Sequence, residues 1–109
     1  IWHSGILRAQ QTAEILAAAL GGSAKVKAAE DLEPKSPVGK LAKRLTSREK
    51  DLAIVGHLPH LGKLASALLS GEKERVAIGF ERSGVLCLER GGDGGWAIRW
   101  MLLPSILPK

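Results

Sequence analysis

The fold class is indicated first by residues 51–61, DLAIVGHLPHL. The apolar run at 52–56 is of the kind found in strands that are buried on both faces of a sheet. The turn at 57–59 then leads into an amphipathic helix, which Gly71 is expected to end. The residues expected on the core side of this helix are Leu61, Leu64, Leu68 and Leu69. A buried strand followed at once by a helix predicts an α/β fold.

The beginning of the sequence repeats this order. Residues 1–3, IWH, are a short apolar lead that indicates the end of a strand. A helix follows, with Ser4 as its expected N-cap and Gly21-Gly22 as its stop. The chain has no initial Met and opens inside an apolar element, which indicates a fragment of a longer protein.

The next two elements are shorter. Residues 25–28 indicate a short strand. Ser36-Pro37 predicts an N-cap followed by proline at the first helical position, which opens a helix with Leu41 and Leu45 facing inward.

The last part of the sequence predicts a hairpin. Residues 84–89 and 96–103 favour strands, joined by the glycine-rich turn at 91–95. Alternation places Trp96 and Trp100 on one strand face, where packing is the expected role. Cys87, centred in the first of these strands, is expected in the core, and Pro104 and Pro108 end the regular structure.

Together these elements predict one α/β domain over residues 1–109. Strand–helix–strand–helix order followed by a hairpin favours a mostly parallel sheet with flanking helices in three layers. The apolar fraction of 45% with 25% charged residues is ordinary for a soluble globular protein. No apolar run approaches the ~18–20 residues that a membrane span needs. The single Cys87 cannot form an internal disulfide, which fits a reducing cytoplasm.

The formal net charge of +5 suggests a polyanionic partner at first sight. However, lysines and arginines are spread along the chain, and the aromatic residues are three Trp and one Phe. Nucleic-acid binding favours a basic stripe with stacking platforms, so the sequence argues against it. A phosphorylated substrate needs only a few well-placed cations.

Two strand-to-helix junctions carry the candidate chemistry. Residues 3–8 form the first junction and residues 55–60 form the second. Both are expected at the same edge of a parallel sheet, where ligands bind and helix N-termini point. Free N–H groups there attract anions, and the guanidinium of Arg8 with the imidazole of His57 would complete a phosphate pocket.

Each candidate also has a structural interpretation. An arginine in a first helical turn is usually a solvated surface charge, and a histidine after an apolar strand is more often structural. His57 and His60 could share a metal ion, but no third ligand is evident nearby. Ser4 is expected only to cap its helix.

These motifs resemble those of a known family. Residues 3–13, HSGILRAQQTA, resemble the S-x-L-x-R-A-x-x-T segment of the histidine phosphatase (phosphoglycerate mutase-like) superfamily, and residues 55–61, VGHLPHL, resemble its second histidine motif. The H-L-P form of that motif, with a helix and Gly71-Glu72 after it, is typical of the short SixA-like phosphohistidine phosphatases. WMLLP at 100–104 resembles their end.

The resemblance implies a phosphoglycerate mutase-like fold, here truncated at the N-terminus, and a phosphohistidine enzyme intermediate. In this family a histidine of an N-terminal Arg-His-Gly motif attacks phosphorus. Two arginines and a second histidine stabilise the charge of the transition state. Arg8 falls on the second arginine and His57 on the second histidine, where a protonated ring would add positive charge. The resemblance requires no metal and no cofactor, which fits a reaction driven by placed positive charge.

The sequence also departs from the family. It contains no Arg-His-Gly, so the nucleophile and the first arginine are missing, and His3 cannot replace them because it follows a different strand. Glu33 matches the proton donor of larger members too weakly to be placed in the site.

The resemblance implies a phosphorylated protein partner, namely phosphohistidine of a signalling protein such as a phosphotransfer domain. The short loop between the motifs favours this substrate, since small-molecule members carry extra covering segments. A small-molecule phosphate-ester phosphatase and a non-catalytic phosphate-binding domain remain the alternatives.

Overall fold

The computed structural model describes residues 1–70 and 84–102 of the chain. Its elements follow the order expected from the sequence. They are β1 (Trp2–His3), α1 (Leu7–Ala19), β2 (Lys27–Ala28), α2 (Gly39–Thr46), β3 (Ile54–Val55), α3 (His60–Ser70), β4 (Val85–Arg90) and β5 (Trp96–Leu102). None of the helices in these two ranges is long and apolar enough to cross a membrane.

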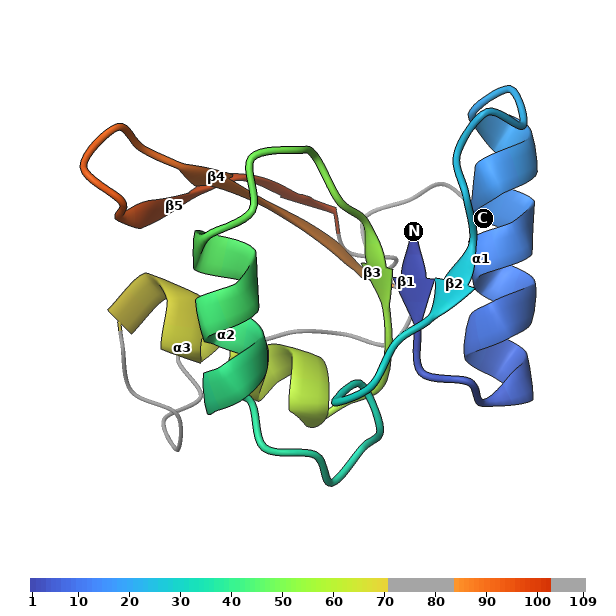
Figure 1. Ribbon diagram of the computed structural model, residues 1–109, viewed down its shortest axis with the longest axis horizontal. Helices are drawn as coiled ribbons and strands as arrows, with labels where there is room; N and C mark the ends of the chain where they lie inside the picture. The colour runs from blue at the N-terminus through green and yellow to red at the C-terminus, as the bar shows by residue number, and fades with distance from the viewer. Residues whose placement is uncertain (71–83, 103–109) are drawn as a thin grey trace.

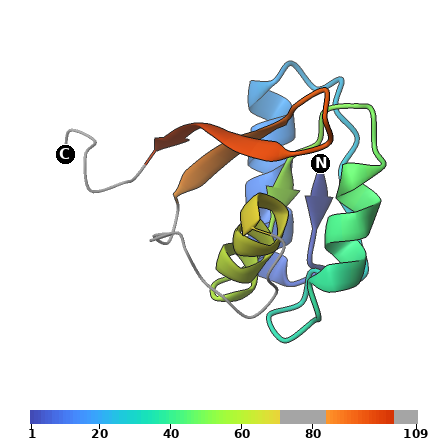
Figure 2. The ribbon, with the colours of Figure 1, turned by 90° about the vertical axis from the view of Figure 1, so that its left-hand side faces the viewer.

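A three-stranded parallel sheet positions the helices. Its strand order is β2-β1-β3, and Trp2 of β1 is in register with Lys27 and with Ile54. α1 lies on one side of this sheet, whereas α2 and the adjoining α3 lie on the other (Figures 1 and 2). Strands β4 and β5 pair antiparallel and form a separate two-stranded sheet. The α/β class with a parallel sheet and flanking helices is confirmed.

Helix α1 starts later than the sequence suggests. Its N-cap position is held by Ile6, and no side chain caps the helix. The prediction that Ser4 is the N-cap is therefore wrong. Ser4 lies two residues earlier, and its Oγ accepts from the amide of Ile6, at 3.4 Å, and not from an amide of the helix. At the other end, Gly21 and Gly22 adopt φ angles of 93° and 77°, a region that favours glycine, so the predicted stop is confirmed.

Helix α2 also begins after its expected start. Ser36 donates its amide to the Glu33 carbonyl at 3.0 Å, which closes a turn over 33–36, and the helix starts only at Gly39. The N-cap assigned to Ser36 is thus wrong by two residues, because local hydrogen bonding holds it in the preceding turn. The inward position of Leu41 and Leu45 is confirmed, since both are buried.

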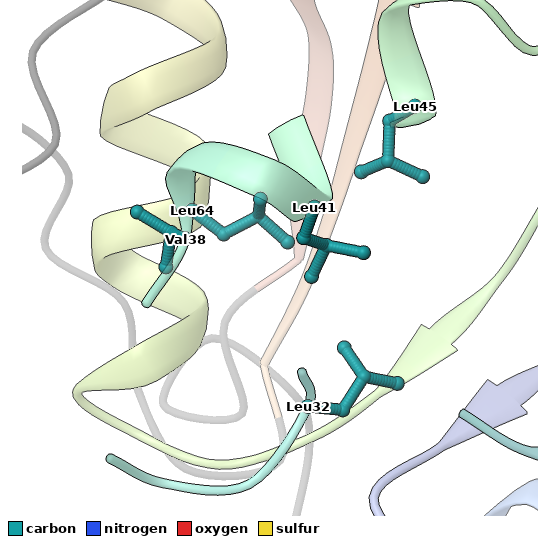
Figure 3. Packing of buried hydrophobic residues seen from close by; sticks show 5 residues of the cluster. All are labelled: Leu32, Val38, Leu41, Leu45 and Leu64. Atoms are coloured by element: carbon teal, nitrogen blue, oxygen red, sulfur yellow. The ribbon is translucent and has the colours of Figure 1, made fainter. Parts of the chain in front are cut away.

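The main core lies between α2, α3 and the loop that precedes α2. Figure 3 shows its five buried side chains. They are Leu32, Val38, Leu41, Leu45 and Leu64. Trp2 packs at the border of this cluster and brings β1 into contact with it. The guanidinium groups of Arg44 and Arg48 lie 4.7 and 5.2 Å from the centroid of the Trp2 ring, so two cations cover the exposed part of the aromatic side chain.

The hairpin contains an irregularity that the sequence did not reveal. Cys87 pairs with Trp100, but Leu88 pairs with Ile98, so β5 holds one extra residue at this point. Trp96 packs against the core, whereas Trp100 is 51% exposed. The prediction of one packed face for both tryptophans is wrong, because the bulge changes which side chains point inward.

Two further expectations concern this region. Cys87 was expected in the core and is half-buried in β4. The glycine-rich turn is confirmed, with Gly94 at a φ of 86° and a Gly91 amide that donates to the Gly95 carbonyl at 2.7 Å. The expected helix stop at Gly71 and the end of regular structure at Pro104 lie outside the described residues.

Candidate functional site

The two strand-to-helix junctions meet at one edge of the parallel sheet. β1 and β3 are parallel neighbours, and His3 is in register with Val55. The residues that follow these two positions therefore leave the sheet at the same edge, the carboxyl edge, where parallel α/β proteins bind their ligands. The expected placement of both junctions at one edge is confirmed.

A direct contact joins the junctions. Ser4 Oγ lies 2.5 Å from Nε2 of His57, although the residues are 53 positions apart. Ser4 is buried, and its contact with His57 is partly buried. Sequence reasoning assigned Ser4 only a capping role and missed this contact. The available signal was the order of the strands, because Ser4 and His57 each follow the end of a neighbouring parallel strand.

Arg8 brings positive charge to the same place. It is the second residue of α1, and its side chain is exposed. Burial lowers the pKa of His57, and the positive charge of Arg8 lowers this pKa further. Both effects favour the neutral form of the ring in the ligand-free structure. A bound phosphate would oppose the effect of Arg8 and favour the imidazolium.

The start of α1 adds to the attraction for anions. The helix has 13 residues, no side chain caps its N-terminus, and no acidic residue lies in its first turn. The partial positive charge of the helix end is therefore not neutralised locally. Gly5, at a φ of 87°, lets the chain turn sharply between β1 and α1, and its amide donates to Nδ1 of His3 at 3.1 Å.

His60 lies close to this site but belongs to the interior. It is the first residue of α3, and only 1% of its surface is exposed. Neither ring nitrogen makes a hydrogen bond of normal geometry. Burial lowers the pKa of His60, and the nearby backbone of Asp31 opposes this shift in part. In the parts of the chain that the structure describes, no three His, Cys, Asp or Glu side chains are grouped as metal ligands.

A hollow of about 450 Å³ lies elsewhere, between α2, α3 and the hairpin. Its lining includes Lys43, Leu68 and Trp96, and no residue of the two junctions. The carboxyl edge of the parallel sheet, with a hydroxyl, an imidazole, a guanidinium and an uncapped helix start, is thus the better candidate for binding a small oxyanion.

Comparisons with known proteins bear on the fold. Neither a protein-family model nor a curated protein sequence matches the chain. Among solved structures, the chain is similar to the protein histidine phosphatase SixA complexed with tungstate, with a TM-score of 0.76 and 23% sequence identity. The similarity covers 95% of this chain and 68% of that protein. The chain therefore has the fold of a SixA-like histidine phosphatase.

Proposed function

We propose that this chain carries the phosphate-binding part of a phosphatase that removes phosphate from phosphohistidine of a signalling protein. The observation that carries the proposal is the contact between Ser4 and His57, 2.5 Å long, which brings the two motif-bearing junctions together beside Arg8. Arg8 would hold the phosphoryl oxygens through its guanidinium fork, and His57 would donate a further hydrogen bond. Both contacts gain strength as charge develops on the phosphoryl group.

The attacking histidine would come from residues outside this sequence. No Arg-His-Gly occurs here, and His60 is too deeply buried to attack a substrate. The sheets are compatible with an additional strand, because in the described residues β3 pairs only with β1 and β4 only with β5. The nucleophile would become a phosphohistidine, and water would then release phosphate. A reducing cytoplasm suits this chain with its single cysteine.

A protein substrate is proposed because the connection between the two motifs is short. Residues 20–53 contain only β2, α2 and their loops, and α2 packs on α3 and the core rather than over the junctions. The site would thus stay open to a protein surface. This openness favours a phosphotransfer domain over a small phosphate ester, whose phosphatases need covering segments.

The test compares how fast the full natural chain hydrolyses two substrates. These are a phosphohistidine-bearing phosphotransfer domain and para-nitrophenyl phosphate. We expect the protein substrate to be hydrolysed faster, and we expect tungstate, a tetrahedral oxyanion, to inhibit competitively. His57→Ala should lower turnover by about two orders of magnitude. The matched control is Arg99→Ala, since Arg99 pairs with Glu89 on the exposed hairpin and should leave turnover unchanged.

The outcomes separate the alternatives. Faster hydrolysis of para-nitrophenyl phosphate would favour a small-molecule phosphatase. Tungstate binding without hydrolysis of either substrate would indicate a non-catalytic phosphate-binding domain. Full turnover in His57→Ala would refute the assignment of this site.

A further inference from the structure

The hydroxyl of Ser4 has two neighbours at the junction of β1 and α1. Its oxygen lies 3.4 Å from the Ile6 amide, which donates to it. Its other neighbour, at 2.5 Å, is Nε2 of His57. Because a serine hydroxyl has one proton and the amide already approaches its oxygen, the proton is free to point at the imidazole. Nε2 is the acceptor that the structure provides for it in the described ranges.

The surroundings of the His57 ring agree with a hydrogen bond in which Ser4 donates and Nε2 accepts. Within residues 1–70 and 84–102, the charged group that acts on the ring is Arg8 of α1, and His60 of α3 lies near it; neither is an acid. Burial and the charge of Arg8 lower the pKa of His57, and both therefore favour the neutral form of the ring. A neutral imidazole has one N–H and one lone pair. If Nε2 accepts from Ser4, the ring proton must sit on Nδ1.

We propose that Ser4 is a positioning residue of this site: its hydroxyl donates to Nε2 of His57 and thereby keeps the ring proton on Nδ1. The Nδ1–H group is then the donor offered to a bound phosphoryl oxygen. This role rests on the proposed phosphatase function, but the hydrogen bond itself does not. Fixing the tautomer and ring orientation of a functional histidine through the other ring nitrogen is a common device in proteins.

The Ser4 hydroxyl can also form a hydrogen bond with the charged form of the ring. When His57 becomes an imidazolium beside a bound phosphate, Nε2 gains a proton, and the same oxygen can accept from it. The contact therefore persists through a proton cycle without movement of either residue. A hydrogen-bond partner that could only donate or only accept would lose the contact in one of the two states.

The first measurement is the tautomer of His57 in the full natural chain, read from ¹⁵N chemical shifts and long-range ¹H–¹⁵N couplings of the ring above its pKa. We expect the Nδ1–H form in the wild type and a shift toward Nε2–H in Ser4→Ala, because free imidazole side chains favour Nε2–H. Ser4→Thr keeps a hydroxyl and should keep the Nδ1–H form. An Nε2–H tautomer in the wild type would overturn the proposal even if Ser4→Ala failed to fold.

The second measurement is turnover of the phosphohistidine substrate. Ser4→Ala should lower kcat by roughly ten- to a hundredfold, the range typical for removing the orienting partner of a functional histidine. KM should change less, because Arg8 still binds the phosphate, and Ser4→Thr should restore most of kcat. Ser47→Ala is the control, since Ser47 Oγ bonds only to backbone carbonyls of α2. We expect this variant to behave as the wild type.

The outcomes distinguish the two proposals. A tautomer shift in Ser4→Ala without any phosphatase activity in the wild type would support the positioning role and refute the proposed function. Loss of activity in His57→Ala, with an unchanged tautomer and unchanged kcat in Ser4→Ala, would support the proposed function and refute the positioning role. An acid-stable phosphate on Ser4 itself would make Ser4 a nucleophile and overturn the positioning role.

Discussion

At the residue scale, the site depends on groups whose neighbours set their charge. Arg8 stays exposed at the start of α1, where its guanidinium is available to a ligand. His57 lies between Arg8 and Ser4, and its pKa is lowered by burial and by the arginine. His60, three residues later, is enclosed in the interior. Two histidines close in sequence therefore have different surroundings, because His57 contacts Ser4 at the junction and His60 is buried.

The first prediction concerns Arg8. In the full natural chain, Arg8→Ala should lower phosphatase turnover by about two orders of magnitude, because the negative charge on the bound phosphoryl group loses its guanidinium partner. Arg8→Lys should restore little, since an ammonium group cannot make the bidentate contact. Phosphate release is the measurement, and circular dichroism should show unchanged folding. Near-normal turnover in a folded Arg8→Ala protein would remove Arg8 from the site.

The second prediction concerns His60 and acid stability. The pKa of His60 is lowered in the folded state, so below its usual value of about 6.5 the unfolded chain binds more protons than the folded one. Stability should therefore fall as the pH decreases from about 6.5 toward the folded pKa. Urea unfolding of wild type and His60→Leu between about pH 8 and pH 5 measures this.

His57, whose pKa is also lowered, contributes in the same direction, so the comparison between the two proteins isolates His60. The leucine variant should lose less stability on acidification. Parallel pH profiles of the two proteins would show that His60 is not protonated on unfolding.

At the element scale, helix α2 lies on the face of the parallel sheet opposite α1. Its apolar stripe, Leu41 and Leu45, packs toward α3, and its Arg44 lies over the ring of Trp2 of β1, as does Arg48 just after the helix. The C-terminal end of α2 is also tied to the hairpin, since the Arg90 guanidinium donates to the Thr46 carbonyl. This one short helix thus connects the parallel sheet, α3 and the hairpin.

The third prediction tests that packing. Leu41 is fully buried, so Leu41→Ala should reduce the free energy of unfolding by about 2–5 kcal/mol. Leu20→Ala removes the same atoms from a side chain that is 58% exposed, so it should change the free energy of unfolding by no more than about 0.5 kcal/mol. Chemical denaturation of both variants provides the measurement. Equal effects in the two proteins would contradict the observed core.

At the scale of the whole molecule, the parallel sheet brings the site together from distant parts of the chain. Ser4 and Arg8 come from the first ten residues and His57 from the middle, and only the pairing of β1 with β3 makes them neighbours. The hairpin forms a second sheet, and within the ranges that the structure describes neither sheet pairs with the other. A strand that joined them would complete one larger sheet.

The fourth prediction concerns residues 1–109 expressed alone, compared with the full natural chain. The short protein should release no phosphate from phosphohistidine substrates and form no phosphoenzyme, because it contains no Arg-His-Gly segment. It should also self-associate, since strand edges stay unpaired and apolar side chains stay exposed within residues 1–70 and 84–102.

Phosphate release and elution volume, measured side by side, test this prediction. We expect activity and monomeric behaviour from a chain that carries an upstream strand ending in Arg-His-Gly. Equal activity of the short protein would mean that another residue, such as His3, performs the attack.

The sequence by itself determined the order of strands and helices, the end of α1 at Gly21-Gly22 and the inward leucines of α2. These features are local, because hydrophobic periodicity and glycine conformation act within a few residues. It also placed both candidate junctions at one sheet edge, since the carboxyl ends of parallel strands lie at the same edge.

Only the tertiary structure decided the rest. The start of α2 lies two residues later than expected because a turn hydrogen bond before the helix competes with the expected cap. Trp100 is exposed because a bulge in β5 changes which side chains face inward, and this bulge arises only in the pairing with β4. The contact between Ser4 and His57, the lowered pKa of His57 and the burial of His60 depend on which residues lie close in space. No local pattern encodes such proximity, since it arises from the register of strands that lie some fifty residues apart in the chain.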